Sequence, residues 1–345
     1  MGTDTEGSES PSAFEATADY EQTTLDYLQE QLDSWVIAPT KILWDDYRGR
    51  FGILVIIFYI LMGTVGVVLV PAPETNMGPR LVQPFQNPQF ILGTDGLGQG
   101  LLSLMVHSTP AMLKMIISGA IFANLLGVTF GLIAGYRGGT TDKAIMTFTD
   151  TVAAIPGIPL LIILAAIIEP RNPFLVGILV TIQGWAGSAR VIRSQVLPLA
   201  DEEHVEAAKA LGQPNSNLLV KEILPHLLPF IFIGFLGRAT RVISASVGLY
   251  FLGVLPFSSQ NWGVTLNSAF NSAGIMYSTR AAHWLLVPLV TIVGLTLGLT
   301  LLAQAFDQVF NPRVRARHRR GDRGTRDIDE PTDTADAQGE VTSIR

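Results

Sequence analysis

A short run of charged and small residues, 201–214, carries the clearest chemical signal in the sequence. It opens with three adjacent carboxylates, Asp201 to Glu203, and continues through an alanine-rich stretch. Carboxylates stabilise a helix N-terminus because they face its partial positive charge, and alanine favours the helical state. Gly212 can adopt the left-handed conformation that ends a helix, and Pro214 prevents its continuation. With Ile223-Leu224-Pro225 downstream, the run predicts two short helices joined by a turn.

The chemistry of the first predicted helix suits contact with another protein. Ala207, Ala208 and Ala210 give it a face of small side chains, which allows a second surface to approach closely. Glu206 and Lys209 would place fixed charges at the rim of that face. We therefore predict a docking element, and the alternative is a helix-turn-helix linker without a partner.

Two arginines interrupt the fifth long apolar block of the sequence. Arg238 and Arg241 are three residues apart and so share one helical face. A charge inside a membrane span costs several kcal/mol unless it is paired or hydrated. The pair predicts a pore-facing or gating element, and the alternative is snorkelling toward the inner surface. Lys114, near the outer end of another block, is predicted to snorkel.

Pro156 opens the sequence Pro-Gly-Ile-Pro at the start of the third apolar block. Proline removes an amide donor and permits a bend, which transporters tolerate where a neighbouring helix satisfies the backbone. Pro156 is therefore predicted to shape a transport pathway, and the alternative is a simple helix start.

Groups that would indicate catalysis or cofactor binding are missing from the sequence. There is no cysteine, the five histidines show no metal-ligand spacing, and no G-x-x-x-x-G-K-[ST] phosphate loop occurs. No Ser/His/Asp or paired-carboxylate constellation lies near the apolar blocks. We predict no catalytic, cofactor-binding or metal-binding residue and expect that the chain is not an enzyme.

The elements that carry these residues are membrane spans. The 345 residues are 48% hydrophobic and only 15% charged, whereas soluble domains carry about 25% charged residues. Six blocks are apolar, and a span needs about 20 such residues. The prediction is an all-α integral membrane protein with six transmembrane helices at 51–70, 110–136, 152–168, 174–189, 227–255 and 284–306.

Positive charge predicts the orientation of the spans. With the N-terminus inside, the outer connections hold only Arg80, Arg171 and Arg280, and the other basic residues near span ends lie inside, which is the usual bias. We expect a multi-pass protein of the cell membrane with both termini cytoplasmic. Before the first span, one helical face collects apolar residues and predicts an amphipathic helix: Leu25, Leu28, Leu32 and Trp35.

These observations divide the chain into five parts. Residues 1–50 form an acidic cytoplasmic tail with the amphipathic helix, and 51–70 form the first transmembrane helix. Residues 71–109 form an external loop, 110–310 a core of five transmembrane helices, and 311–345 a disordered cytoplasmic tail.

The docking segment resembles the EAA loop of ABC importer permeases. The resemblance is carried by Glu206-Ala207-Ala208, by Gly212 and by Ile223-Leu224-Pro225. In that family the loop inserts into a groove of the ATP-hydrolysing subunit. The resemblance implies that these seven residues couple the spans to an ATPase.

Further motifs resemble one branch, the dipeptide/oligopeptide/nickel permeases, and specifically the second permease subunit. Its LGTD-x-LG segment is similar to residues 92–98, and its inner loop to 135–139, with the resemblance extending over roughly 40–315. This sequence departs from the branch pattern at Gln99-Gly100, His204 and Gln213-Pro214. The remaining matching positions are Asp142, Met146, Asp150, Ile155-Pro156, Trp185, Arg190, Arg193, Phe251-Leu252-Gly253 and Trp262-Gly263.

The resemblance implies a type I importer permease (MetI-like) fold that moves a solute, by default a peptide. The implied partners are a second permease, two cytoplasmic ABC ATPases, an external solute-binding protein and membrane lipid, without nucleic acid. No cofactor would bind this chain, because ATP and Mg²⁺ would be used by the ATPases. Alternatives are a permease for oligosaccharides, nickel or another solute and, outside the family, an ATP-independent channel or a membrane enzyme.

Overall fold

A computed structural model describes residues 43–44, 46–257, 260–272 and 281–310. The predicted amphipathic helix and the C-terminal tail lie outside these residues. The described part is all-helical, apart from an isolated bridge between Thr94 and Gly100. Its helices are α3 (Tyr47–Leu69), α4 (Leu101–Arg137), α5 (Gly139–Ala154), α6 (Gly157–Ile168), α7 (Pro173–Val180), α8 (Gly184–Ala200), α9 (Glu203–Ala210), α10 (Asn215–Asn217), the π-helix η3 (Leu218–Ile223), α11 (Leu224–Phe251), α12 (Trp262–Ser272) and α13 (Ala282–Phe310).

The candidate membrane spans are four continuous helical segments and two bent pairs of helices. Within the described residues, α3, α4, the run from α10 to α11, and α13 are each long and apolar enough to span a membrane. If the bent pairs α5–α6 and α7–α8 are each counted as one span, the described residues contain six candidate spans. The helical fold class is confirmed, and six spans are consistent with these helices.

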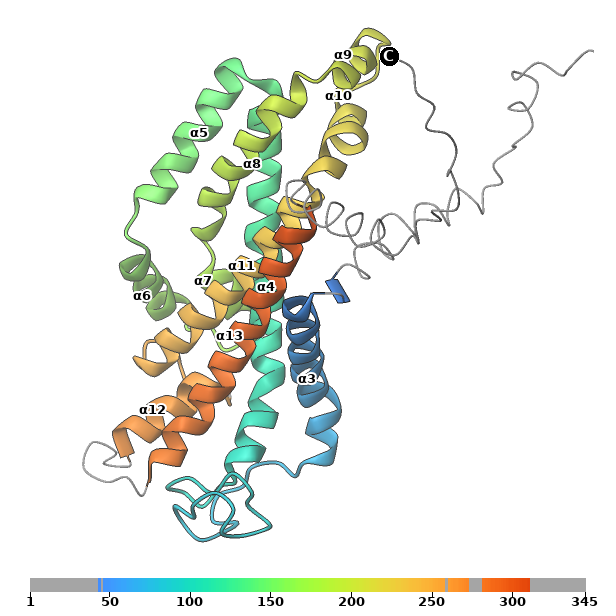
Figure 1. The fold of residues 1–345 in the computed structure, drawn as a ribbon. Helices are drawn as coiled ribbons and strands as arrows, with labels where there is room; N and C mark the ends of the chain where they lie inside the picture. The colour runs from blue at the N-terminus through green and yellow to red at the C-terminus, as the bar shows by residue number, and fades with distance from the viewer. Residues whose placement is uncertain (1–42, 45, 258–259, 273–280, 311–345) are drawn as a thin grey trace, which may run out of the picture.

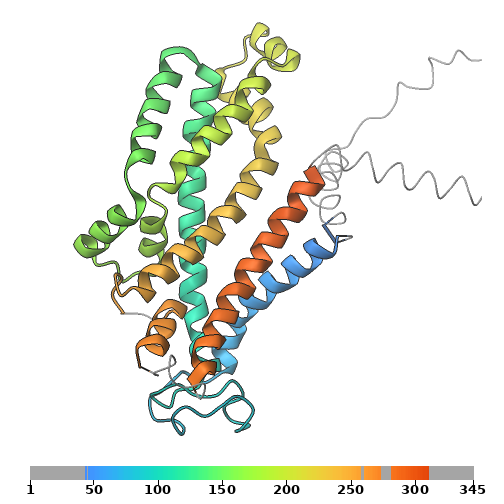
Figure 2. The ribbon, with the colours of Figure 1, turned by 60° about the vertical axis from the view of Figure 1, so that its left-hand side comes forward.

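The long helix α4 forms the axis of the molecule. It runs from the end that carries α9 and α10 to the opposite end, where the loop of residues 70–100 lies (Figures 1 and 2). It begins at Leu101 and not at Pro110 as predicted. Leu101 and Met105 are fully buried, so tertiary packing holds these turns in a helix although Pro110 lacks an amide donor.

A row of glycines on α4 lets α8 pack closely against it. A Cβ atom at Gly127 would overlap Ser188, and one at Gly131 would lie 2.7 Å from Cβ of Ile192. Gly135 stands in the same relation to Val196, again at 2.7 Å. Small residues at four-residue spacing bring helix backbones together in membranes. Helices α4 and α8 therefore form one closely packed pair.

The third and fourth predicted spans are broken instead of straight. The axes of α5 and α6 differ by 80°, and those of α7 and α8 differ by 57°. The first break lies at Ile155-Pro156, so the bend predicted from Pro156 is present. The second lies at residues 181–183. Gln183 joins the two breaks, because its Nε2 donates hydrogen bonds to the carbonyls of Val152 (3.0 Å) and Ile155 (2.6 Å).

Replacing Gln183 by leucine is expected to destabilise the protein by about 1–3 kcal/mol. The change keeps the approximate side-chain volume but removes two hydrogen bonds to backbone carbonyls, at about 0.5–1.5 kcal/mol for each bond. Thermal unfolding of the purified protein in detergent measures the effect. Gln89→Leu is the matched control, because Gln89 is exposed and its side chain should contribute little. An equal loss in both variants would contradict a role for Gln183 at the breaks.

Two predictions between residues 215 and 283 need correction. The second short helix of the docking segment is not separate, since α10, η3 and α11 follow without interruption. Pro225 cannot donate an α-helical hydrogen bond, and the wider turn of η3 lies directly before it. The connection between the fifth and sixth predicted spans, residues 256–283, is not only a loop but contains α12. Gly263 allows this helix to lie against Tyr250 of α11, and Trp262 is fully buried.

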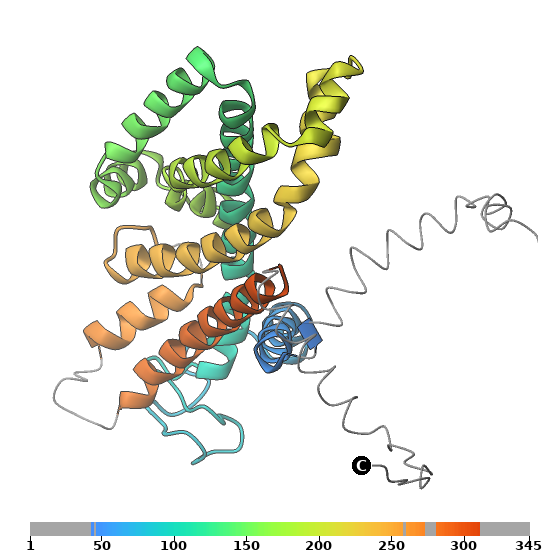
Figure 3. The same ribbon diagram turned by 45° about the horizontal axis from the view of Figure 1, so that its top comes forward.

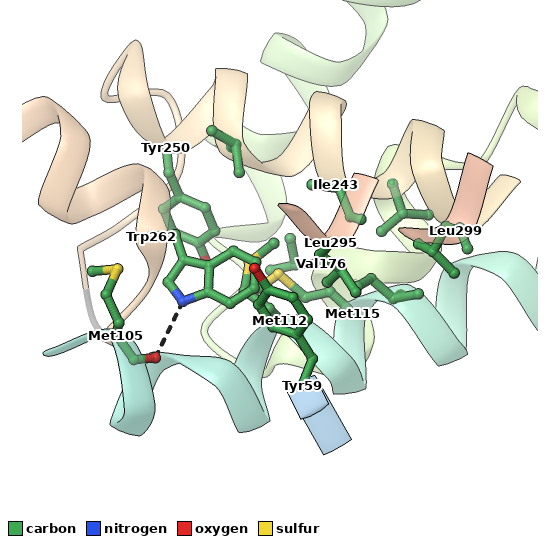
Figure 4. Packing of buried hydrophobic residues seen from close by; sticks show 14 of the residues in the cluster. Tyr59, Met105, Met112, Met115, Val176, Ile243, Tyr250, Trp262, Leu295 and Leu299 are labelled. Carbon is green, nitrogen blue, oxygen red and sulfur yellow. Dashed lines mark hydrogen bonds between the residues drawn. The ribbon is translucent and has the colours of Figure 1, made fainter. Parts of the chain in front are cut away.

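The hydrophobic core lies where α12 meets α4 and α11. The indole Nε1 of Trp262 donates to the carbonyl of Met105 at 3.2 Å, and Tyr59 of α3 packs edge-on against the same indole (Figure 4). Met112 and Met115 fill the space beside these rings, and both are fully buried. This core fixes the position of α11, which carries the two span arginines.

Helix α3 lies at the edge of the bundle beside α13. Figure 3 shows α3 on one side of the molecule and the α5–α6 pair on another. Only 11% of the most apolar 18-residue stretch of α3 is buried, and large side chains such as Leu54, Phe58 and Val68 are exposed. An apolar surface of this kind suits contact with lipid hydrocarbon.

Candidate functional site

Helix α9 has the ends that the sequence predicts. Glu202 is its N-cap residue, and Glu203 and Glu206 lie in its first turn. At the other end, the amide of Gly212 donates to the carbonyl of Lys209, and the amide of Gln213 donates to that of Ala208. These two bonds, with Gly212 at φ +77°, form a Schellman motif. The predicted helix stop at Gly212 is confirmed.

One side of α9 packs on the rest of the chain. Val205 is fully buried in a cluster with Ile192 and Val196 of α8 and Leu227 of α11. Ala208 is also buried, at 7% exposure. The small face predicted from Ala207, Ala208 and Ala210 is therefore divided. Ala208 serves packing within the chain, because it follows Val205 at three-residue spacing and shares its face.

The opposite side of α9 is available to a partner. Glu206, Ala207 and Ala210 are exposed, and Leu211 is 83% exposed directly after the helix. Leu211 follows Ala207 at four-residue spacing and extends the apolar face. We name Glu206, Ala207, Ala210 and Leu211 the docking face. The motif did not identify Leu211, although its spacing from Ala207 was a usable signal.

Lys209 is exposed and also anchors α9. Its Nζ donates to the carbonyl of Ala200 at 3.3 Å and lies 5.2 Å from the centre of the Tyr136 ring. The Tyr136 hydroxyl donates to Oδ1 of Asn215 at 2.9 Å. The end of α4, the end of α8 and the start of α10 are thus joined around α9.

The three downstream motif residues lie where α9 meets the fifth span. Ile223 is fully buried and belongs to the same cluster as Val205. Leu224 and Pro225 are half-buried at the start of α11. These residues connect the docking segment to α11 and offer little surface to a partner.

Two ion pairs connect α5 to α8. Nε and Nη2 of Arg193 donate to the two carboxylate oxygens of Asp142, which makes a bidentate pair. Nη1 of Arg190 lies 3.5 Å from Oδ1 of Asp150, and both side chains are more than half exposed. The first pair is much better shielded, with side-chain exposures of 32% and 13%.

Asp142→Asn is expected to lower the free energy of unfolding by about 1–3 kcal/mol, since Arg193 loses a charged bidentate partner. Asp150→Asn is the control, and it should cost less than about 1 kcal/mol because that pair is exposed and makes one contact. Thermal unfolding of both variants in the same detergent provides the comparison. A larger loss for Asp150→Asn would contradict this ranking.

Arg238 and Arg241 both line a cavity of about 490 Å³ between α11, α4 and the break between α7 and α8. Arg238 is half-buried, and its Nη1 donates to Oδ1 of Asn124 on α4 at 2.8 Å. Arg241 is exposed. Pro156 lies at the neighbouring break and does not line this cavity.

The LGTD-like segment organises the loop of residues 70–100. Thr94 is fully buried, donates to the carbonyl of Pro79 at 2.6 Å and accepts from the amide of Val82 at 2.9 Å. Oδ1 of Asp95 accepts from the amides of Leu97 (2.9 Å) and Gln99 (2.7 Å). Burial raises the pKa of Asp95, and its backbone hydrogen bonds partly oppose the shift. The motif therefore has a structural role here.

Comparison with known proteins agrees with this architecture. Residues 127–316 match the family described as the binding-protein-dependent transport system inner membrane component. The oligopeptide transport system permease protein of Bacillus subtilis is 31% identical over 232 residues, which cover 64% of this chain and 75% of that protein. The dipeptide transport system permease protein of the same organism is 26% identical, with coverages of 76% and 81%.

A third relative comes from another transport system. The glutathione transport system permease protein of Pectobacterium atrosepticum is 29% identical over 226 residues, covering 65% of this chain and 73% of that protein. The resemblance to dipeptide and oligopeptide permeases is confirmed. The family match includes the docking helix, both span arginines and the last 11 residues of α4. The chain belongs to the family of binding-protein-dependent transport system inner membrane components.

Proposed function

We propose that the chain is the permease subunit of an ATP-driven importer and translocates short peptides delivered by an external solute-binding protein. The observation that carries the proposal is the docking face, an exposed patch of small and apolar residues with one carboxylate on a helix anchored to α4, α8 and α11. It lies at the opposite end of the molecule from the loop of residues 70–100 (Figure 1).

The proposed complex contains a second, homologous permease and two cytoplasmic ABC ATPases. ATP and Mg²⁺ act on the ATPases, and this chain binds neither. Family membership supports a complex of this kind. The positive charges near the span ends support a cell-membrane protein with α9 and both termini in the cytoplasm and the loop of 70–100 outside.

The proposed mechanism is alternating access driven through α9. ATP binding closes the ATPase dimer and displaces the docking face. Because α9 directly follows α8 and packs on α11, its displacement moves two membrane-spanning segments together. Such coupling requires that the docking face bind one ATPase conformation better than the other.

The substrate class rests on the relatives. Their names refer to oligopeptides, dipeptides and glutathione, which are all peptides. Permeases for oligosaccharides, nickel or other small solutes remain the alternative within the family. Outside it, an ATP-independent channel or a membrane enzyme would need no docking face.

Affinity purification of the tagged full-length chain from gently solubilised native membranes tests the proposal. Mass spectrometry should identify two nucleotide-binding chains, a second permease and a solute-binding protein. The ligand of the recovered binding protein, measured by calorimetry against peptides and sugars, then tests the substrate class. Recovery of the chain alone, with no ATP-dependent uptake by the membranes, would contradict the importer.

A further inference from the structure

The cavity at Arg238 and Arg241 combines two cationic groups with small and hydroxyl side chains. Thr181, Thr240 and Ser244 contribute the hydroxyl groups, and alanine and glycine form much of the remaining lining. Its volume, about 490 Å³, lies in the range of about 300–1,000 Å³ that is typical of small-molecule sites. The cavity can therefore accommodate a small polar ligand.

Among the residues that the structure describes, no acidic residue lines the cavity. The ion pairs among the described residues join Arg190 to Asp150, Arg193 to Asp142 and His204 to Glu202, and none includes Arg238 or Arg241. Two cations close together within an apolar span repel each other and are costly without an anion. The described part of the chain therefore supplies the positive half of an ion pair and lacks the negative half.

Arg238 is held in place for such an anion. Its Nη1 is fixed by Asn124 at 2.8 Å, and the amide of Asn124 donates in turn to the carbonyl of Ile231 at 3.3 Å. A Cβ atom at Gly234 would press on the same guanidinium, so glycine leaves it the necessary room. The Nε of Arg238 is buried and has no acceptor within the described residues. A positioned guanidinium suits charge-assisted hydrogen bonding to a carboxylate.

We propose that Arg238 and Arg241 form a carboxylate-binding site on the translocation pathway, and that the anion is the free carboxylate of the transported peptide. This inference rests on the proposed function. A short peptide carries a terminal carboxylate whatever its side chains, so one cationic site serves many peptides. Arg241 is exposed, which lets the anion enter and leave, whereas Arg238 is the positioned partner.

The test uses the complete importer in vesicles of phosphatidylcholine alone, so that no anionic lipid can bind the two arginines in place of the peptide carboxylate. ATP-driven uptake of tri-alanine and of its C-terminal amide is measured for the wild type, Arg238→Gln and Arg241→Gln. Lys114→Gln is the matched control, because Lys114 is an exposed cation on α4 outside the cavity. The same binding protein delivers both peptides, so its own selectivity cancels when the uptake ratio is compared between variants.

Each arginine variant is expected to lower the ratio of free-acid to amide uptake by about ten- to a hundredfold, as expected for the loss of a charged hydrogen bond. Lys114→Gln should keep the wild-type ratio, and ATP hydrolysis stimulated by the binding protein should persist in all variants. If an arginine variant loses uptake of tri-alanine and of its amide equally, or loses the second permease on purification, the inference is overturned. The anion that pairs with the arginines would then belong to the partner permease. Failure of the wild type and Lys114→Gln to import either peptide would instead contradict the proposed peptide importer.

Discussion

Leu211→Asp is expected to remove the ATPases from the purified complex and to abolish ATP-driven uptake. Leu211 is 83% exposed and completes the apolar part of the docking face beside Ala207 and Ala210. A carboxylate buried at the centre of an interface costs more than about 2 kcal/mol, which corresponds to at least about thirtyfold weaker binding. The permease itself should fold normally, since the side chain contributes little to its own core.

Leu97→Asp is the matched control for this experiment. Leu97 is 52% exposed, but it lies in the loop of residues 70–100 at the opposite end of the molecule. Purification of the tagged permease, with the ATPase recovered per permease measured by quantitative mass spectrometry, distinguishes the two positions. Full recovery with Leu211→Asp would exclude Leu211 from the ATPase contact. Equal loss in both variants would indicate a general defect of the permease.

Gly212→Val is expected to uncouple the importer while its amount in the membrane stays normal. At φ +77° a side chain strains the backbone by about 1–2 kcal/mol, and a β-branched one is especially unfavourable. A backbone change that relieves this strain breaks the Schellman motif and alters the orientation of the docking face. Uptake should fall by about five- to thirtyfold at a retained rate of ATP hydrolysis.

Gly212→Asn separates backbone strain from side-chain bulk. Asparagine adopts the left-handed conformation more readily than other non-glycine residues, and no atom of the described residues lies within 4 Å of a Cβ placed at this position. Uptake by Gly212→Asn should therefore stay close to the wild-type rate. Wild-type uptake by Gly212→Val would reject the coupling role of this turn. Loss of uptake in both variants would assign the effect to contact with the partner.

The docking helix could be predicted because its signals are local. Acidic residues at the start, alanines in the middle and Gly212 at the end each act within one or two turns of α9. Which side of that helix faces inward could not be predicted. The buried position of Ala208 depends on Ile192 and Val196, which belong to another helix. The exposure of Leu211 follows from the same packing.

The long apolar helices were also predictable, but the shapes of the third and fourth spans were not. Apolar composition identifies a segment that can cross a membrane, and Pro156 indicates a bend. The 80° angle between α5 and α6 accompanies a contact with Gln183, which lies 28 residues after Ile155. Likewise, the sequence identifies Arg238 as costly in a span, whereas its partner Asn124 is 114 residues away.

The contact made by Gln183 bears on how the protein is inserted during synthesis. The bent α5–α6 segment leaves the ribosome before Gln183 has been made, and until then the carbonyls of Val152 and Ile155 lack this donor. The carbonyl of Val152 still accepts from the amide of Ile155, but the carbonyl of Ile155 waits for Gln183, and an unpaired carbonyl is costly in hydrocarbon. We therefore expect the insertion machinery to retain α5 and α6 until α7 and α8 arrive, and to release the four helices into the bilayer as a single hairpin.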